Sequence, residues 1–410
     1  MILNYIWIGL VLLAILMGVV QCFCYGQTDI FSEILNSTFG SAKNGFEISL
    51  GLTGVLSLWM GIMKIGERGG VVGTLSKGVA PFFNRIFPEV PQGHPVYGSM
   101  LMNVAANMLG LDNAATPMGL KAMSELQELN TDKNRASNAM IMFVVLGASG
   151  LTLVPTTIMA YRAQLGAANP ADIFLPILIA TYAATLVGLL CCCAWQKIKI
   201  WDPVVLSVLV GLTGLVGFIV WGASRLPQET LTQVSSMAAA VILLGIITWF
   251  ILQAMVRKVN VYDAFIDGAK DGFKTAVGII PYLIAILVAV GMFRASGAMD
   301  LLEQGLAWMF GVCGINPDMA AAVPTALMKP LSGSGARGLM LEAMTTHGAD
   351  SLVGRLCCIL QGTTDTTFYV LAVYFGSVGI KDTRHAVACC LLADLAGAVA
   401  AFVVAGVFFG

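Results

Sequence analysis

The sequence has little charge: only 11% of its 410 residues are Asp, Glu, Lys or Arg, and the formal net charge is -1. Since no Lys/Arg run is dense enough to follow a phosphate backbone, no nucleic-acid partner is expected. Hydrophobic residues make up 58% of the chain, which is more than a soluble globular protein of this length needs. The composition therefore indicates a polytopic membrane protein.

Histidine is scarce, and cysteine is not spaced as a metal site. The chain has three histidines, and its ten cysteines lie in or beside apolar runs without C-x-x-C spacing. We therefore expect no metal and no cofactor. The GSGARG run at 333–338 lacks the spacing of a phosphate loop, and the sequence has no G-x-S-x-G elbow. An enzyme is accordingly not expected.

Long apolar runs predict the fold class. Runs of about 18 residues or more can cross the hydrocarbon core of a bilayer. The sequence has nine such runs, at 2–22, 46–66, 137–161, 172–194, 203–222, 231–255, 277–293, 351–376 and 383–409. The first lacks the basic start and cleavage site of a signal peptide, so we expect it to be retained. The prediction is an all-α polytopic membrane protein with about nine spanning helices.

Three short motifs occur twice in the same order, which indicates an internal duplication. SAKNGFE is echoed by GAKDGFK, GLKAM by MLEAM, and PTTIMAYRAQLG by DTTFYVLAVYFG. With a cytoplasmic N-terminus and re-entrant segments near 97–113 and 318–336, most basic residues fall in inner loops, as the positive-inside rule requires. In that topology the halves are inverted repeats with interrupted helices, an architecture typical of secondary transporters.

Four polar stretches interrupt the apolar pattern, at 102–117, 151–157, 328–338 and 361–369. Pro155 and the Gly-Ser-Gly run at 333–335 are expected to unwind helices, and unwound backbone at membrane depth must be buried in protein or face water. These stretches predict one central polar site between the two halves. Its expected binding residues are Asn103, Asn107, Asn113, Thr116, Thr156, Thr157, Lys329, Ser332, Ser334, Arg337, Gln361, Thr363, Thr364, Asp365, Thr366 and Thr367.

Two of these stretches suggest different ligands. The turn from Ser332 to Arg337 precedes a helix, whose free N–H groups favour an anionic or hydroxyl-bearing group. In QGTTDTT, at 361–367, a carboxylate among hydroxyls resembles a Na⁺ or H⁺ site. A carboxylate in a spanning helix costs about 3 kcal/mol and is a functional candidate by default, which singles out Asp365.

Each polar residue also has a structural interpretation. Thr and Asn in membrane helices often hydrogen-bond a neighbouring helix and only stabilise the bundle. Asp365 could form a salt bridge with Lys329 or Arg337, and Lys329 could instead bind substrate. Asp394, in the last helix, is a weaker candidate. The amphipathic stretches 69–87 and 259–275 are expected to lie at the membrane surface.

Longer motifs resemble a known family. NMLGLDNAATP, within residues 1–200, resembles spore maturation protein A, while KPLSGSGARG and QGTTDTTFYVLAVYFG, within 231–410, resemble spore maturation protein B. The chain thus looks like a fusion of the two, both members of the nucleoside-recognition, or Gate-domain, family. The resemblance implies two Gate halves, 1–200 and 231–410, joined by a membrane helix at 201–230, in a transporter-type protein of the bacterial plasma (inner) membrane.

These observations leave two hypotheses. The first is a secondary transporter or permease for a small polar solute, with a nucleoside-like solute as the first expectation. The second is a non-transporting scaffold that retains a transporter fold and recruits partners for envelope or spore assembly. The expected partners are a small-molecule or ion substrate, membrane lipid and, because large apolar faces remain, a second copy of the chain in a homodimer.

Overall fold

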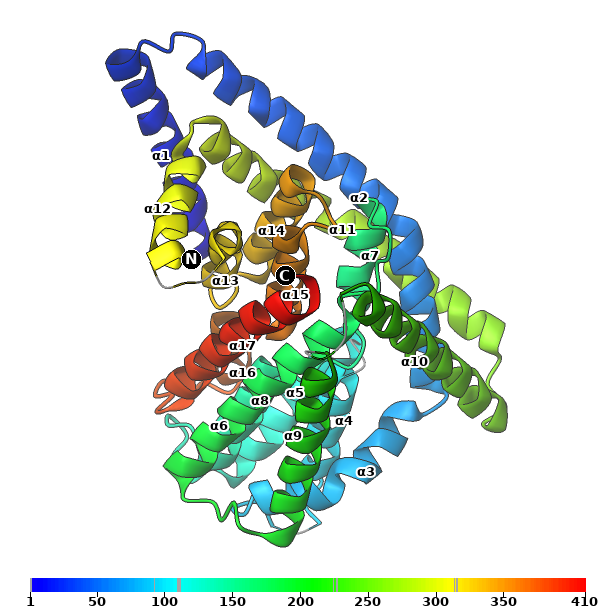
Figure 1. Ribbon diagram of the computed structural model, residues 1–410. Coiled ribbons are helices and arrows are strands. Elements are labelled where there is room, and N and C mark those ends of the chain that lie inside the picture. Colours follow the sequence, from blue (N-terminus) through cyan, green and yellow to red (C-terminus); the bar gives the residue numbers. More distant parts are fainter. Residues whose placement is uncertain are drawn as a thin grey trace. The chain divides into compact units, whose positions relative to one another are not determined.

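The computed structural model of the chain describes residues 2–410 apart from 92, 109–111, 224, 226–227, 313 and 315. It is 81% helical, and the described residues form no named strand (Figure 1). The helices are α1 Ile2–Tyr25, α2 Ile30–Arg68, α3 Val71–Ile86, α4 Val96–Met108, α5 Asp112–Leu129, α6 Asn138–Ser149, α7 Thr156–Gln164, α8 Phe174–Gln196, α9 Pro203–Ala223, α10 Gln228–Val256, α11 Val261–Ala295, α12 Ala298–Val312, the 3₁₀ helix η1 Pro317–Ala322, α13 Val323–Met328, α14 Gly333–His347, α15 Leu352–Thr363, α16 Thr367–Ser377 and α17 Ala386–Phe409.

The helices confirm an all-α polytopic membrane protein, with seven rather than nine long spans. Among the described residues, the segments long and apolar enough to cross a membrane lie in α1, α2, α8, α9, α11, the pair α15 and α16, and α17. The predicted span at 137–161 is instead the short helix α6, a break, and α7. The predicted span at 231–255 falls in α10, where Ala240–Val256 is the apolar segment.

Every polar stretch predicted to interrupt a helix lies at a helix end. Among the described residues, the breaks fall between α6 and α7, between α13 and α14, and between α15 and α16. In the stretch 102–117, residues 109–111 between α4 and α5 lie outside the described residues. Helix α4 packs against α5, and α13 packs against α14, so each of these pairs is a helical hairpin. Pro155 directly precedes α7. Proline is tolerated before the first turn of a helix, but it has no N–H group with which to extend the preceding helix α6.

The chain forms two compact units that each draw on both halves of the sequence. Unit 1 comprises Met1–Leu58, Thr157–Pro170 and Lys270–Gln361, and unit 2 comprises Trp59–Thr156, Ala171–Ala269 and Gly362–Gly410. The sequence division at 1–200, 201–230 and 231–410 therefore describes chain order rather than compactness, and it stays a prediction. The inverted relation of the two halves also stays a prediction.

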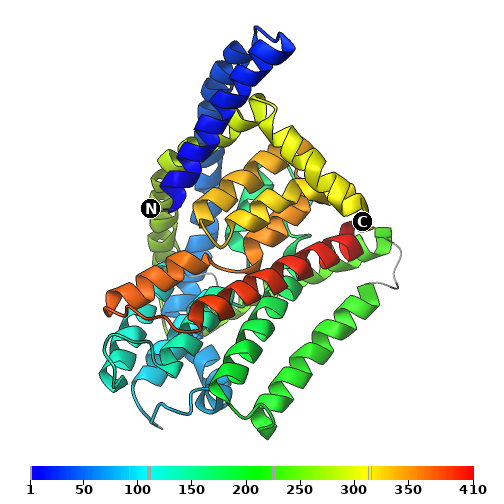
Figure 2. The same ribbon diagram turned by 90° about the vertical axis from the view of Figure 1, so that its left-hand side faces the viewer.

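Unit 2 is built around α6, whose residues Met140–Val145 are all fully buried. A helix that is apolar on every side has to be surrounded by other elements. Helices α8 and α17 pack along α6 and along each other, and α16 contacts α5, α6 and α17. In Figure 2 the orange α16 lies beside the red α17. Helices α6, α8, α16 and α17 make the contacts at the two breaks that are described below.

Unit 1 includes a close approach between α2 and α11. A Cβ atom added to Gly272, the second glycine of GAKDGFK, would lie 2.6 Å from the Cα atom of Ser57. Glycine at this position therefore lets the two backbones approach, as small residues do between membrane helices. The predicted surface stretch at 259–275 is continuous with the long helix α11, whereas the stretch at 69–87 forms the separate helix α3.

Candidate functional site

Two helix breaks meet inside unit 2. The N–H group of Asp365, between α15 and α16, donates to the carbonyl of Ala148 near the end of α6 at 2.8 Å. The N–H group of Thr366 donates to Oδ1 of Asp365 at 2.6 Å. Backbone groups released by the unwinding are thus satisfied by the other break and by the local carboxylate, as buried backbone requires. We call these contacts the crossed break.

Helix α17 fixes one side of the crossed break. The hydroxyl of Thr367 is fully buried and donates to Oδ2 of Asp394 at 2.7 Å. A Cβ atom added to Gly397 would collide with the methyl group of Thr363 and lie 3.0 Å from Cβ of Ala184. Glycine is therefore needed where α17 passes the end of α15. Asp394, the weaker candidate of the sequence analysis, positions the first residue of α16.

On the other side of the crossed break, helix α8 supplies hydrogen-bond donors from two threonines that were not predicted. Thr185 donates through its hydroxyl to the carbonyl of Ser149 at 3.0 Å, and Thr181 donates to that of Gly150 at 3.0 Å. These are the carbonyls left unpaired where α6 ends. The signal was available, because two threonines four residues apart on an apolar helix lie on the same face.

Asn103 connects the first predicted stretch to α16. Its side chain is fully buried, and Nδ2 donates to the carbonyl of Ala115 at 2.7 Å and to the hydroxyl of Tyr374 at 3.2 Å. Asn107 in turn donates to Oδ1 of Asn103 at 3.4 Å. The Tyr374 ring stacks on Phe143, with centroids 5.8 Å apart. Unit 2 thus connects Asn103 to Tyr374, which lies beyond the predicted stretch 361–369. That 102–117 and 361–369 share one binding site stays a prediction.

The remaining predicted residues of unit 2 differ in exposure. Thr363, Thr364, Thr366 and Thr367 are buried, as is Thr156, whereas the side chain of Asp365 is exposed. Thr116 is half-buried in α5, and the side chain of Asn113 lies outside the described residues. Buried threonines therefore precede and follow one exposed aspartate in the chain.

The other predicted residues lie in unit 1, around the start of α14. Ser332 caps this helix, because its hydroxyl oxygen accepts the N–H of Gly335 at 3.0 Å. The helix begins earlier than predicted, since residues 333–337, expected to form an unwound turn before it, are its first helical residues. Arg337 lies over the ring of Tyr161, 5.8 Å from its centroid. Lys329 is buried, and Thr157 belongs to α7. That all four stretches surround one central site stays a prediction.

Gln361 brings α15 to the start of α14. Its side-chain Nε2 donates to the carbonyl of Gly333 at 3.4 Å. Ser334, one residue further along α14, has its hydroxyl oxygen 3.3 Å from that of Ser332. The start of α14 is therefore a cluster of hydroxyl, amide and backbone groups.

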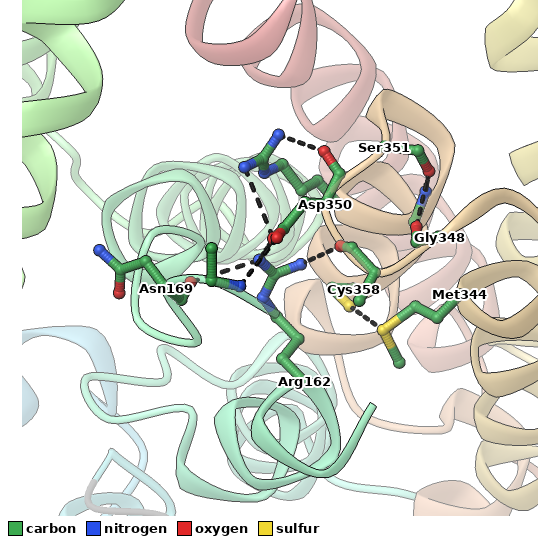
Figure 3. Close-up of polar contacts among 11 residues, drawn as sticks. Arg162, Asn169, Met344, Gly348, Asp350, Ser351 and Cys358 are labelled. Carbon is green, nitrogen blue, oxygen red and sulfur yellow. Dashed lines mark hydrogen bonds and ion pairs between the residues drawn. The ribbon is translucent and has the colours of Figure 1, made fainter. Parts of the chain in front are cut away.

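An ion pair of a buried arginine in unit 1 was not predicted. Arg162, at the end of α7, is fully buried and donates to Asp350 Oδ1 at 2.9 Å and to the carbonyls of Ala349 and Asn169 at 2.5 and 3.3 Å (Figure 3). Arg355 contacts the same carboxylate oxygen at 3.6 Å. Arg162 and Asp350 are 188 residues apart, so no local pattern could have paired them.

A second charged cluster in unit 1 was also not predicted. Arg294, near the end of α11, contacts Glu303 at 2.8 Å, Glu342 at 3.2 Å and Asp300 at 3.6 Å. It thereby connects α11 to both α12 and α14. Both charged clusters link helices of unit 1 that are distant in the sequence, which indicates a structural role.

Comparison with known proteins agrees with the sequence motifs. The model of the nucleoside-recognition family, called Gate, matches residues 49–166 and 276–381. Spore maturation protein B of Bacillus subtilis (strain 168) is 44% identical over 165 residues, which are 40% of this chain and 91% of that protein. Spore maturation protein A of the same organism is 39% identical over 178 residues, which are 43% of this chain and 87% of that protein.

The two relatives match different parts of the chain, which is consistent with the predicted fusion. All sixteen predicted binding residues lie within the segments that the family model matches, whereas Thr181, Thr185 and Asp394 lie outside them. The family model covers more than half of the 410 residues. The chain is therefore a multi-pass membrane protein that belongs to the nucleoside-recognition, or Gate, family.

Proposed function

We propose that this protein is a transporter or permease for a small polar solute in the bacterial inner membrane, and that it has no catalytic role. The family to which it belongs is described by nucleoside recognition, which supports a solute-binding function. Interrupted membrane helices support it as well, because transporters form their substrate and ion sites where helices unwind.

The observation that carries the proposal is the exposure of Asp365. This residue lies near the middle of the apolar segment Leu352–Ser377, yet its carboxylate is exposed while the flanking threonines are buried. A carboxylate facing lipid at that depth costs about 2.5 to 3.5 kcal/mol. Asp365 is therefore expected to face an aqueous path or a bound solute rather than hydrocarbon.

The chemistry of the crossed break suits a cation or a hydrogen-bond donor. Carboxylate, hydroxyl and carbonyl oxygens are hard ligands of the kind that metal cations prefer. The Thr366 N–H occupies one side of Asp365 Oδ1, which orients the carboxylate without neutralising it. We propose that Asp365 binds a coupling cation or a polar group of the passenger, and that the buried threonines keep the unwound backbone in place.

The test is ligand-induced thermal stabilisation of the purified full-length protein. The probes are nucleosides, amino acids, small carboxylates and monovalent and divalent cations. A ligand that binds the native state raises its stability by about 2.7 kcal/mol at a hundredfold excess over Kd. We expect a shift with one class of ligand in the wild type and no shift in Asp365→Asn, whose amide oxygen can still accept the Thr366 N–H.

The matched control is Asp132→Asn. Asp132 is an exposed loop residue whose Oδ1 accepts a nearby backbone N–H, from Asn134 at 3.1 Å, much as Asp365 accepts from Thr366. This variant should keep the wild-type response. If no probe stabilises the wild type and Asp365→Asn only lowers its stability, Asp365 is structural. That result would support a membrane scaffold for envelope or spore assembly instead.

A further inference from the structure

The start of α14 has hydrogen-bonding capacity that the chain leaves unused. Within the described residues, the N–H groups of Gly333 and Ser334 have no acceptor, whereas the next two N–H groups of the helix, those of Gly335 and Ala336, bond to Ser332. Such N–H groups at a helix start need an external acceptor and carry partial positive charge. Gly333 and Ser334 are half-buried, so a small molecule can reach them.

Gln361 provides an independent second observation. Its side chain is only 8% exposed, and its Oε1 atom is buried without a hydrogen-bond partner. The amide orientation is fixed by the contact from Nε2 to the Gly333 carbonyl, because the flipped amide would place two acceptors against each other. An unpaired buried acceptor of this kind costs about 1 to 3 kcal/mol, so a donor at this point is stabilising.

These two features together select one kind of ligand group. The helix start offers donors and would by itself favour an anion. A carboxylate has no hydrogen to give to Gln361 Oε1, and the negative charge of any anion would be repelled by the lone pairs of that atom. A hydroxyl group both accepts from the Gly333 and Ser334 N–H groups and donates to Gln361 Oε1.

We propose that the start of α14 and Gln361 form a binding site for a hydroxyl group of a neutral, polyhydroxylated solute. All of its residues belong to unit 1. The site deepens the proposed function by giving the chemical class of the passenger. This inference rests on the proposed function in one respect: it takes the solute bound at this site to be the solute that is transported.

The test compares alcohols with their methyl ethers, which can accept a hydrogen bond but cannot donate one. Erythritol and myo-inositol, and the fully O-methylated form of each, are titrated into the purified full-length protein, and Kd is measured by calorimetry or thermal stabilisation. We expect the wild type to prefer each alcohol over its ether about 3- to 10-fold, the range that one neutral hydrogen bond supplies.

Variants of Gln361 locate that preference. Gln361→Leu removes the acceptor and should bind alcohol and ether equally. Gln361→Glu keeps an acceptor but loses the Nε2 donor to the Gly333 carbonyl, so it should bind both more weakly and still prefer the alcohol. Gln304→Leu, an exposed glutamine of α12 in the same unit, should behave as the wild type. If Gln361→Leu does not fold, the comparison of Gln361→Glu with the wild type still tests whether an acceptor is sufficient.

Three results would overturn the inference: equal binding of alcohol and ether by the wild type, tighter binding of acetate or inorganic phosphate than of either polyol, or no binding of any probe, as expected if ordered water occupies the site. The proposed function fails separately. Suppose that polyol binding depends on Gln361, that no polyol flux into proteoliposomes is seen, and that Asp365→Asn changes no ligand-induced stabilisation. The binding site would then be retained and the transport function rejected.

Discussion

The crossed break of unit 2 and the Arg162–Asp350 pair of unit 1 differ in whether the charged side chain is exposed or buried. In the crossed break, backbone groups and threonine hydroxyls bond to one another, and the carboxylate of Asp365 stays exposed. In unit 1 the guanidinium of Arg162 is fully buried and bonds to Asp350 and to two carbonyls. The difference indicates that the pair is a fixed structural joint, whereas the crossed break keeps a charge available for a ligand.

The largest effect is expected from breaking the structural joint. Arg162→Met leaves the carbonyls of Ala349 and Asn169 without their donor and removes a partner from Asp350. Asp350 is 36% exposed and keeps Arg355 as a partner, so the loss comes mainly from the two carbonyls. Removing a donor from such an acceptor costs about 1 to 3 kcal/mol of unfolding free energy for each. Denaturant unfolding of the purified protein in detergent should show a loss of this size, with ligand responses at Asp365 unchanged in the fraction that remains folded.

The control for Arg162→Met is an exposed ion pair. Arg135 and Asp382 lie 3.1 Å apart, and each side chain is 58% exposed. Because exposed pairs contribute about 0 to 1 kcal/mol, Arg135→Met should change stability by less than that. Equal losses for the two variants would contradict the assignment of Arg162 as a structural joint.

An intermediate effect is expected within the crossed break itself. Thr367→Val removes the hydroxyl that donates to Asp394 and leaves a buried carboxylate oxygen without that donor. A hydrogen bond to a charged group is worth about 1.5 to 3 kcal/mol. In a double-mutant cycle with Asp394→Asn, the coupling energy between the two positions should be about 1 kcal/mol or more.

Thr345→Val is the matched control for Thr367→Val. The Thr345 hydroxyl donates to the carbonyl of Leu341 in its own helix, at 2.8 Å, so its loss should cost little. A coupling energy near zero between Thr367 and Asp394 would mean that Asp394 does not position α16. It would also return Asp394 to the ligand candidates of the sequence analysis.

The sequence predicted the local features of the molecule better than the distant ones. The breaks at Pro155 and around Asp365 were predicted at the correct positions, because proline, threonine and aspartate disfavour helix interiors. The prediction that 333–335 is unwound was wrong: Ser332 caps α14, so these residues form its first turn and the break lies at 329–332. The span count was too high by two. The apolar run at 137–161 contains one of these breaks, and within the run at 231–255 the apolar segment among the described residues is only Ala240–Val256. Partner choice, as between Arg162 and Asp350, depends on packing across 188 residues and has no local signal.

The candidate site shows the same division. Asn103 and the threonines from 363 to 367 could be named from the sequence, because polar residues stand out in apolar helices. Their partners could not be named: the carbonyl of Ala148, which receives the Asp365 N–H, belongs to an ordinary alanine. Tyr374 was also missed, since a tyrosine in an apolar helix is not by itself a polar signal.

The smallest effect is expected for the pH dependence of stability that His385 of unit 2 contributes. Its imidazole is held neutral, in contrast to the charged pair of unit 1. His385 precedes α17, stacks on Trp195 with ring centroids 5.7 Å apart, and receives an amide N–H of Gln196 at its Nε2 atom at 3.3 Å. That bond requires an unprotonated Nε2. Burial, and secondarily the charge of Arg384, lower the pKa of His385 below its ordinary value of 6.5.

The sign of the pH dependence follows from that shift. Above pH 6.5 the histidine is neutral in both states and contributes no pH dependence. As the pH falls through 6.5 the unfolded chain binds the proton first, so the folded state loses stability until the pH passes the lowered pKa. Unfolding measured from pH 8 to 5 should show a loss in the wild type that is smaller in His385→Gln. Identical pH profiles for the two proteins would show that His385 titrates alike in both states and that its contact with Gln196 does not select the neutral ring.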